Sequence, residues 1–247
     1  MLYETLLEIV KNTRSIRRFK PDPIPDENID KIIEIARWAP SGFNQQPWEY
    51  VIVKNPELRK KITDSFKAYW SQSREMETTR ESWQKVWNPE TVGNQADYSI
   101  APVIILLFGD TRTKEGLPMG VRFDAHRCEY IYISSLANTF LYMHMAAATL
   151  GLASQWLSTV ATPYVHCMIK EWLGIPSQLE IYDALALGYP AVQPRPKLLR
   201  EKNKMVHFDY CGSDVFRTDK EVKDFIRKAR TWTIASHNRK PDGKKGT

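Results

Sequence analysis

Two arginines and a serine lie close together near the start of the chain, in the stretch RSIRRF at residues 14–19. Arg14 and Arg17 carry guanidinium groups, and Ser15 adds a hydroxyl between them. A guanidinium binds a phosphate through paired, charge-assisted hydrogen bonds. The segment is therefore a candidate anion site, although arginines that follow a helix also occur simply as surface residues.

A polar turn stands directly in front of an apolar strand, in the stretch PSGFNQQPWEY at residues 40–50. Pro, Gly and Asn are residues that tight turns favour. Loops that a rigid strand positions often carry the binding groups of a protein. This turn is thus a second candidate site element.

The common nucleotide and hydrolase motifs do not occur. No G-x-G-x-x-G follows a predicted strand, and there is neither a G-x-x-x-x-G-K-[ST] loop nor a G-x-S-x-G elbow. A Cys/His nucleophile pair is a minor alternative, since His126 lies two residues from Cys128 and His166 adjoins Cys167. Neighbours that close along a chain rarely face each other. We therefore predict no catalytic side-chain nucleophile and no metal site.

Composition indicates an ordinary globular protein. The 247 residues are 43% hydrophobic and 26% charged, enough for a sizeable core. The net charge of +6 comes from the end of the chain, because residues 197–247 hold fourteen Lys/Arg against seven Asp/Glu. A solvated tail at residues 236–247 explains this better than nucleic-acid or membrane contact, since no earlier segment combines a basic stripe with aromatic stacking positions. We expect no nucleic-acid partner.

Cysteine usage and hydropathy favour a cytoplasmic protein. Cys128, Cys167 and Cys211 are odd in number and far apart, which argues against a disulfide framework and a zinc site. Residues 130–153 are long and mostly apolar, but Ser, Thr, Asn and His interrupt them. They predict a helix buried in a core or at a subunit interface rather than one in a membrane.

Helices and strands alternate irregularly, which predicts an α+β sandwich with one sheet. A first helix over 3–11 should turn Leu6, Leu7 and Val10 inward, and Asp26 should cap a second helix that Pro40 ends. Strands are expected at 49–53, 101–110 and 181–190, and helices at 130–153, 163–174 and 213–232. We predict one domain over 1–235, with a polar helical excursion at 66–94.

The excursion carries Trp70, Trp83 and Trp87 among charged residues. It could cover a site as a lid or simply pack on the domain. Aromatic residues at helical spacing are more often part of a core than of a ligand cage. Both readings stay open.

Five stretches, in this order and spacing, resemble the nitroreductase family of FMN-dependent oxidoreductases. They are RSIRRF, PDPIPDE, IARWAPSGFNQQPWEYVIV, LGLASQWLS and ALGYPAVQPRP, and the resemblance covers most of residues 10–200. The run APSGFNQQPW is the most specific of them. The resemblance implies an α+β sandwich with a mostly antiparallel central sheet flanked by helices, in a homodimer that holds two FMN molecules at its interface.

The resemblance also implies which residues contact FMN. Arg14 and Ser15 match residues that hold the phosphate and ribityl chain, and Arg17 matches a cation near flavin N1 and O2. Thr13 stands where many relatives have a further arginine, so its hydroxyl could take over part of the phosphate grip. Two further segments match the surroundings of the flavin ring: Pro40, Ser41, Gly42 and Asn44 in the turn, and Trp156, Leu157, Ser158 and Thr159 with a backbone N–H near N5. After GYPA, Arg195 is the expected phosphate contact, with Lys197 and Arg200 as competitors.

The implied function is hydride transfer from NADH or NADPH through flavin N5 to a small aromatic acceptor, a nitroaromatic or a quinone, in a ping-pong scheme. A flavin carries the reactive atom itself, which agrees with the lack of a nucleophile motif. Specialised branches of the family instead perform reductive dehalogenation or modify a flavin under a substrate lid, and they are the alternative. A non-enzymatic flavin-storing or basic nucleic-acid-associated protein is a third possibility.

Overall fold

The sheet has four strands, and every neighbouring pair is antiparallel. Its order is β1-β2-β4-β3, with β1 at Trp48–Val53, β2 at Val103–Asp110, β3 at Ala153–Leu157 and β4 at Leu179–Gly188. The two central strands are the most apolar segments, as a strand covered on both faces requires. The predicted α+β class and antiparallel sheet are confirmed, and the expected strands agree with β1, β2 and β4 within two residues at either end.

The computed structural model describes residues 2–84, 98–193, 196–212 and 215–237. Two compact units emerge: Met1–Tyr69 with Asp97–Pro194, and Trp70–Ala96 with Arg195–Thr247. The first unit contains the whole sheet. The single domain predicted over 1–235 stays a prediction, and most of the tail predicted at 236–247 lies outside the described residues.

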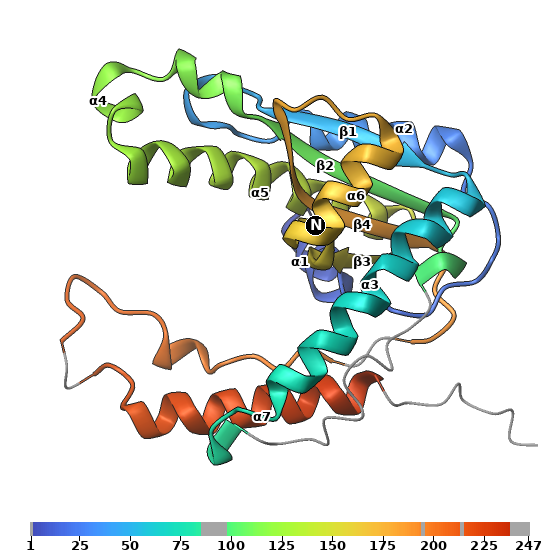
Figure 1. Cartoon of the computed structure of the whole chain (residues 1–247). Helices are drawn as coiled ribbons and strands as arrows, with labels where there is room; N and C mark the ends of the chain where they lie inside the picture. Colours follow the sequence, from blue (N-terminus) through green and yellow to red (C-terminus); the bar gives the residue numbers. More distant parts are fainter. Residues whose placement is uncertain (1, 85–97, 194–195, 213–214, 238–247) are drawn as a thin grey trace, which may run out of the picture. The chain divides into compact units, whose positions relative to one another are not determined.

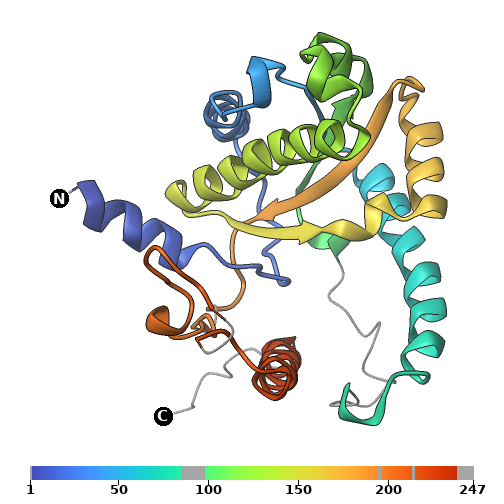
Figure 2. The same cartoon turned by 90° about the vertical axis from the view of Figure 1, so that its left-hand side faces the viewer.

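Helices of the first unit cover both faces of the sheet (Figure 1 and Figure 2). Figure 2 shows α2 and α5 on one face, and α6 with the start of α3 on the other. The helices are α1 Leu2–Asn12, α2 Asp26–Ala36, α3 Pro56–Glu77, α4 Met119–Arg122, α5 Ala125–Thr149, α6 Pro163–Leu173 and, in the second unit, α7 Asp219–His237. This gives the first unit the layers of an α+β sandwich.

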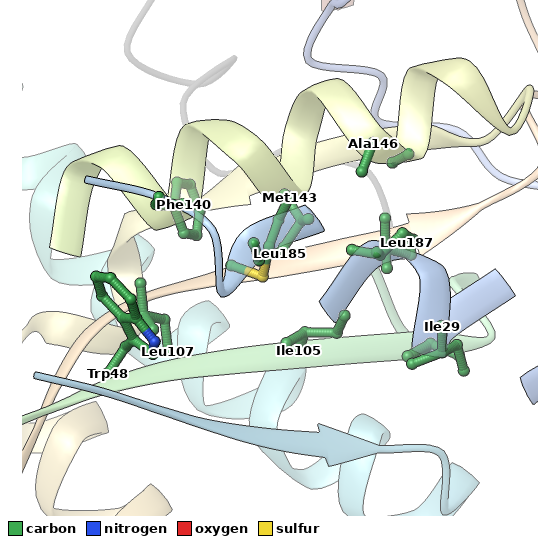
Figure 3. Packing of buried hydrophobic residues seen from close by; sticks show 14 of the residues in the cluster. Ile29, Trp48, Ile105, Leu107, Phe140, Met143, Ala146, Leu185 and Leu187 are labelled. Atoms are coloured by element: carbon green, nitrogen blue, oxygen red, sulfur yellow. The ribbon is translucent and has the colours of Figure 1, made fainter. Parts of the chain in front are cut away.

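The core between the sheet and α2 and α5 is built from alternate strand residues. Ile105 and Leu107 of β2 and Leu185 of β4 point toward α5, where Phe140 and Met143 meet them (Figure 3). Side chains alternate between the faces of a strand, so the intervening residues of β2 serve the second layer. Among the largest fully buried side chains are Ile62 and Phe66 of α3 and Ile169 of α6. Each face of the sheet thus has its own apolar cover.

The long helix α5 is buried on one side only. Asp124 caps it by accepting a hydrogen bond from the Arg127 backbone N–H. Tyr130, Ile133 and Leu141 remain 69%, 41% and 53% exposed in the single chain. A helix is therefore present where one was predicted, but it ends at Thr149, and the described residues leave its second apolar face exposed.

Two predictions about the helices are wrong, the burial of α1 and the cap of α2. Leu6 and Val10 of α1 are each 49% exposed, and no residue of α1 is buried, so this amphipathic helix does not turn its apolar face into the core. Asp26 is the first residue of α2 rather than its cap; Pro25 occupies the cap, and the Asp26 carboxylate pairs with Lys54. By contrast, α6 begins at Pro163 and ends before a left-handed Gly174, as predicted.

The second unit pairs the end of α3 with α7. Glu77 of α3 accepts hydrogen bonds from Arg80 and from Arg230 of α7. The Lys223 ammonium lies 5.3 Å from the ring centroid of Trp83. Part of the predicted 66–94 excursion is thus helix α3 and a short 3-10 turn at Ser82–Gln84, whereas Trp87 falls outside the described residues. Whether it acts as a lid stays a prediction.

Among the helices the structure describes, none combines the length and apolarity that a membrane crossing needs.

Candidate functional site

The RSIRRF segment lies against the free edge of β3 and then against the chain that leaves β4. Ser15 forms a parallel bridge with Ser154, where the Ile16 backbone N–H donates to the Ser154 carbonyl over 3.0 Å. Further on, Ala191 N–H donates to the Arg18 carbonyl over 3.0 Å. Backbone pairing therefore brings together three stretches that are far apart in sequence: RSIRRF, LASQWLS and ALGYPA.

Arg14 has unmet hydrogen-bonding capacity. Its Nη1 donates to the Thr13 carbonyl over 2.7 Å, whereas its buried Nε has no acceptor among the described residues. A buried donor without an acceptor is costly, and an anion supplies what a guanidinium lacks. Ser15 beside it is exposed. The hydroxyl of Thr13 already donates to the Ile9 carbonyl over 2.8 Å, so it caps the end of α1 instead of offering its proton to a ligand.

Arg17 is oriented by a buried tyrosine. Tyr98 is 3% exposed, and burial raises the pKa of its hydroxyl, while a hydrogen bond with Arg17 and the charge of Arg17 act in the opposite direction. Tyr98 lies just before β2, at the point where the chain rejoins the first unit. Arg17 thus interacts with a buried tyrosine that the sequence analysis did not single out.

The end of β3 presents both side chains and backbone at this place. Trp156 is 48% exposed, Leu157 is buried at 4%, and Ser158 opens a short 3-10 helix that runs to Ala161. Ser158 is exposed and Thr159 is half-buried. The alternation means that Trp156 and Ser158 are available to a ligand, with Leu157 anchoring the segment in the core.

The turn before β1 is held tightly to α5. Gly42 N–H donates to Ser135 Oγ over 3.0 Å, and Asn138 Nδ2 donates to the Pro40 carbonyl over 2.9 Å. A Cβ at Gly42 would lie 2.2 Å from Ile131 Cγ2, so only glycine allows this approach.

Within the turn, hydrogen bonds support an unusual backbone. Ser41 Oγ accepts from the Gln46 N–H over 3.0 Å, and Asn44 Oδ1 accepts from Gln46 Nε2 over 2.9 Å. Phe43, Asn44 and Gln46 all have positive φ, between 44° and 53°. Left-handed non-glycine residues cost energy and gather at binding sites.

These two groups of predicted site residues are attached at different places along α5. The turn contacts α5 at Ser135 and Asn138, whereas β3 is joined to α5 by His144, whose Nδ1 lies 2.8 Å from Ser154 Oγ. His144 lies six to nine residues beyond these two contacts, about 9 to 13 Å along the axis at about 1.5 Å per residue. The structure therefore unites Arg14, Ser15 and Arg17 with the end of β3, and leaves the turn further along α5.

The predicted phosphate contact Arg195 lies outside the described residues. Its competitors Lys197 and Arg200 belong to the second unit, where Arg200 Nη2 donates to the Lys204 carbonyl over 2.9 Å. In the ranges described, no group of three or more His, Cys, Asp or Glu residues could hold a metal ion.

Two buried polar residues beside this site were missed by the sequence reading. His144 packs edge-on against Phe140 with ring centroids 5.1 Å apart, and burial lowers its pKa to about 4. Asp183 in β4 is 6% exposed; burial raises its pKa to about 6, and the Trp156 indole acts against this increase. The signal for Asp183 was visible as the one charge inside the apolar run IYDALALG.

The chain is similar in sequence to known proteins over most of its length. The family profile described as Nitroreductase family matches residues 10–189. A protein of Archaeoglobus fulgidus named for NADH dehydrogenase/NAD(P)H nitroreductase is 27% identical over 76% of this chain and 86% of its own length. Iodotyrosine deiodinase 1 of Rattus norvegicus is 27% identical over 77% of this chain, which spans 64% of that protein.

A solved structure has the same fold. The FMN-bound nitroreductase of Bacteroides fragilis superposes with a TM-score of 0.59 at 21% identity, over 83% of this chain and 98% of that one. At this level of identity the likeness concerns the fold alone.

Proposed function

This chain belongs to the nitroreductase family, and from that premise we propose that it binds FMN and transfers hydride from NADH or NADPH to a nitroaromatic or quinone acceptor. The observation that carries the proposal is the backbone pairing of RSIRRF with the end of β3 and the chain after β4. That pairing places a cation with a spare donor beside an exposed strand end.

The residues present fit such a cofactor. Arg14 needs an anionic acceptor for its buried Nε, and the exposed hydroxyl of Ser15 adds a donor, which suits the phosphate of FMN. Bound FMN would supply the redox chemistry, accepting and giving hydride at N5. We assign to Trp156, Leu157, Ser158 and Thr159 the contacts along the ring, including the backbone donor near N5.

Arg17 is proposed as the cation beside the N1 and O2 edge. A fixed positive charge at a place where negative charge develops lowers the free energy of the reduced state. The bond to Tyr98 keeps Arg17 from relaxing away from that position, because the tyrosine is itself buried. The protein needs no side-chain nucleophile for this chemistry.

A second copy of the chain would complete the site. The turn with Pro40, Ser41, Gly42 and Asn44 is held to α5 about 9 to 13 Å along the helix from His144, which contacts the Ser154 that pairs with Ser15, at about 1.5 Å per helical residue. In a homodimer formed across the exposed apolar face of α5, the turn of one subunit could meet the β3 end of the other. We therefore propose a homodimer with two equivalent cofactor sites.

Rapid mixing without oxygen tests the proposed reaction. FMN-loaded protein should lose its oxidised-flavin absorption on addition of NADH or NADPH and regain it on addition of a nitroaromatic or quinone. Arg17→Ala should slow the first step by about tenfold or more, because one charge interaction with the reduced state is lost. A flavin that stays oxidised with both nicotinamides would contradict the proposal.

A deiodinase-like reductive dehalogenation is the second candidate. It is favoured by the similarity to an iodotyrosine deiodinase and by the additional unit formed from Trp70–Ala96 and the C-terminal segment. In that case, protein reduced with dithionite should release iodide from 3-iodotyrosine, while NADH and NADPH alone reduce the flavin only slowly. Fast reduction by a nicotinamide without iodide release would leave the first candidate.

A further inference from the structure

Asp183 is an unexpected residue for its position. It lies in the central strand β4, 6% exposed, opposite Leu107 of β2 and two residues before the buried Leu185. Figure 3 shows Leu107 and Leu185 in the apolar layer under Phe140 of α5. A carboxylate in such surroundings costs free energy unless it is paired.

The pairing of Asp183 is incomplete. Among the described residues its Oδ1 has no hydrogen-bond partner, and the carboxylate forms no salt bridge. Burial raises the pKa of Asp183 to about 6, and the neighbouring Trp156 indole acts against this increase. A single neutral donor does not offset the burial of a carboxylate.

Trp156 is the neighbour of Asp183 on the adjacent strand β3. It pairs with Leu185 across the β3–β4 ladder, so Asp183 lies diagonally next to it. Its ring packs against Phe140 with centroids 5.4 Å apart and remains 48% exposed. The residue is followed directly by Leu157, Ser158 and Thr159.

We propose that Asp183 is a positioning residue, which holds the Trp156 indole in one orientation as a wall of the cofactor slot at the end of β3. This inference rests on the proposed FMN function. An exposed aromatic ring on a strand end has several rotamers available, and a charged acceptor fixed in the core selects one of them. On this view, the free-energy cost of burying the Asp183 carboxylate is tolerated because a fixed indole orientation improves cofactor binding.

If Asp183 had a packing role alone, replacing it would lower stability and leave FMN affinity unchanged. Leucine has the same branching as aspartate and no desolvation cost, so Asp183→Leu should unfold at a higher denaturant concentration than the wild type. If Asp183 serves the site, the same variant should bind FMN more weakly. Stability and affinity are therefore expected to change in opposite directions.

The experiment follows the indole and the cofactor separately. In FMN-free protein, the Trp156 indole ¹H–¹⁵N cross-peak is assigned by its loss in Trp156→Phe. Asp183→Leu should move this cross-peak strongly, and Asp183→Asn, which keeps an acceptor oxygen, should leave it near its original position. In an FMN titration, Asp183→Leu should weaken binding by about tenfold and Asp183→Asn by at most about threefold, as expected for loss or retention of one hydrogen bond.

Two further variants complete the test. Asp30→Asn removes an exposed carboxylate on α2 and should change neither readout. Trp156→Phe should weaken FMN binding as much as Asp183→Leu does, and the double variant should be no worse than either, because both remove one interaction. Should Asp183→Leu fail to fold, Asp183→Asn and Trp156→Phe still decide the matter.

The outcomes separate this inference from the proposed function. An unchanged cross-peak in Asp183→Leu, or a shifted cross-peak with unchanged FMN affinity, overturns the positioning role. A wild-type protein that does not bind FMN refutes the proposed function and with it this role, while the cross-peak still reports whether the hydrogen bond exists.

Discussion

His144 joins the helix that crosses the sheet to the strand that forms the site. Its Nδ1 lies 2.8 Å from Ser154 Oγ, and the backbone of the same Ser154 holds the RSIRRF segment. The His144 ring is 9% exposed and packs on Phe140, and this burial favours the neutral imidazole in the folded protein. At the scale of single residues, a buried histidine that the sequence did not single out therefore supports the strand that pairs with RSIRRF.

This burial makes stability depend on pH. The pKa of His144 is lowered from 6.5 to about 4 in the folded chain, so its contribution is complete above pH 6.5 and is lost as the pH falls toward 4. At pH 4.5 the loss should reach about 2.5 kcal/mol relative to pH 7.5. In urea unfolding, the stability difference between wild type and His144→Asn should shrink by that amount, because asparagine does not titrate.

Asp183 also titrates in this pH range, but its contribution to stability is the same in wild type and His144→Asn and cancels when the two are compared at each pH. The raised pKa of Asp183, about 6, has the opposite sign: it stabilises the fold as the pH falls. An equal stability difference at both pH values would show that His144 titrates normally.

At the scale of elements, the positions of helices and strands were easier to predict than the surfaces that they pack against. Pro163 and Gly174 fixed both ends of α6, and continuous apolar runs predicted β2 and β4, because these features depend on nearby residues alone. The amphipathic pattern of α1 was also real, yet its apolar face is exposed. Periodicity defines a face of a helix and does not say what covers it.

The candidate site shows the same division. RSIRRF and the end of β3 were predicted from motifs, and the structure brings them together. The separation of the turn along α5 could not be predicted, because it follows from tertiary packing. Asp183 and Tyr98 were missed because their roles arise from neighbours distant in sequence, Trp156 and Arg17.

The second unit depends on one carboxylate between two helices. Glu77 of α3 accepts from Arg80 and from Arg230 of α7, and both arginines hold the pKa of its carboxyl below the usual range, with Arg80 the stronger influence. Glu77→Gln should therefore weaken the attachment of α7 by about 1 kcal/mol. Amide hydrogen exchange in residues 219–232 should become about fivefold faster, since local opening follows that free energy.

Glu75→Gln is the matched control, because this neighbouring residue on α3 is exposed and its side chain lies outside the Arg80 and Arg230 contacts. It should leave exchange in α7 unchanged. Equal exchange in wild type and Glu77→Gln would mean that α7 is held by its other contacts, such as the bond from Arg227 Nε to the Trp83 carbonyl.

At the scale of the whole molecule, exposed apolar faces support the proposed homodimer. In the first unit, α1 exposes Leu2, Tyr3, Leu6 and Val10, and α5 exposes Tyr130, Ile133 and Leu141. Apolar surface of this kind on two helices is typical of a subunit interface. A dimer would cover both faces and would also account for a binding turn that lies away from the cation segment of its own chain.

Native mass spectrometry after incubation with FMN tests the central claim most directly, since it counts chains and cofactors together. For the wild type we predict two chains with two FMN molecules. For Arg14→Ala we predict dimers that have lost most of their FMN, because the guanidinium with the unpaired Nε is gone. Lys11→Ala, an exposed change near the end of α1, should retain both cofactors. A wild type without FMN, or Arg14→Ala with its FMN complement intact, would contradict the account.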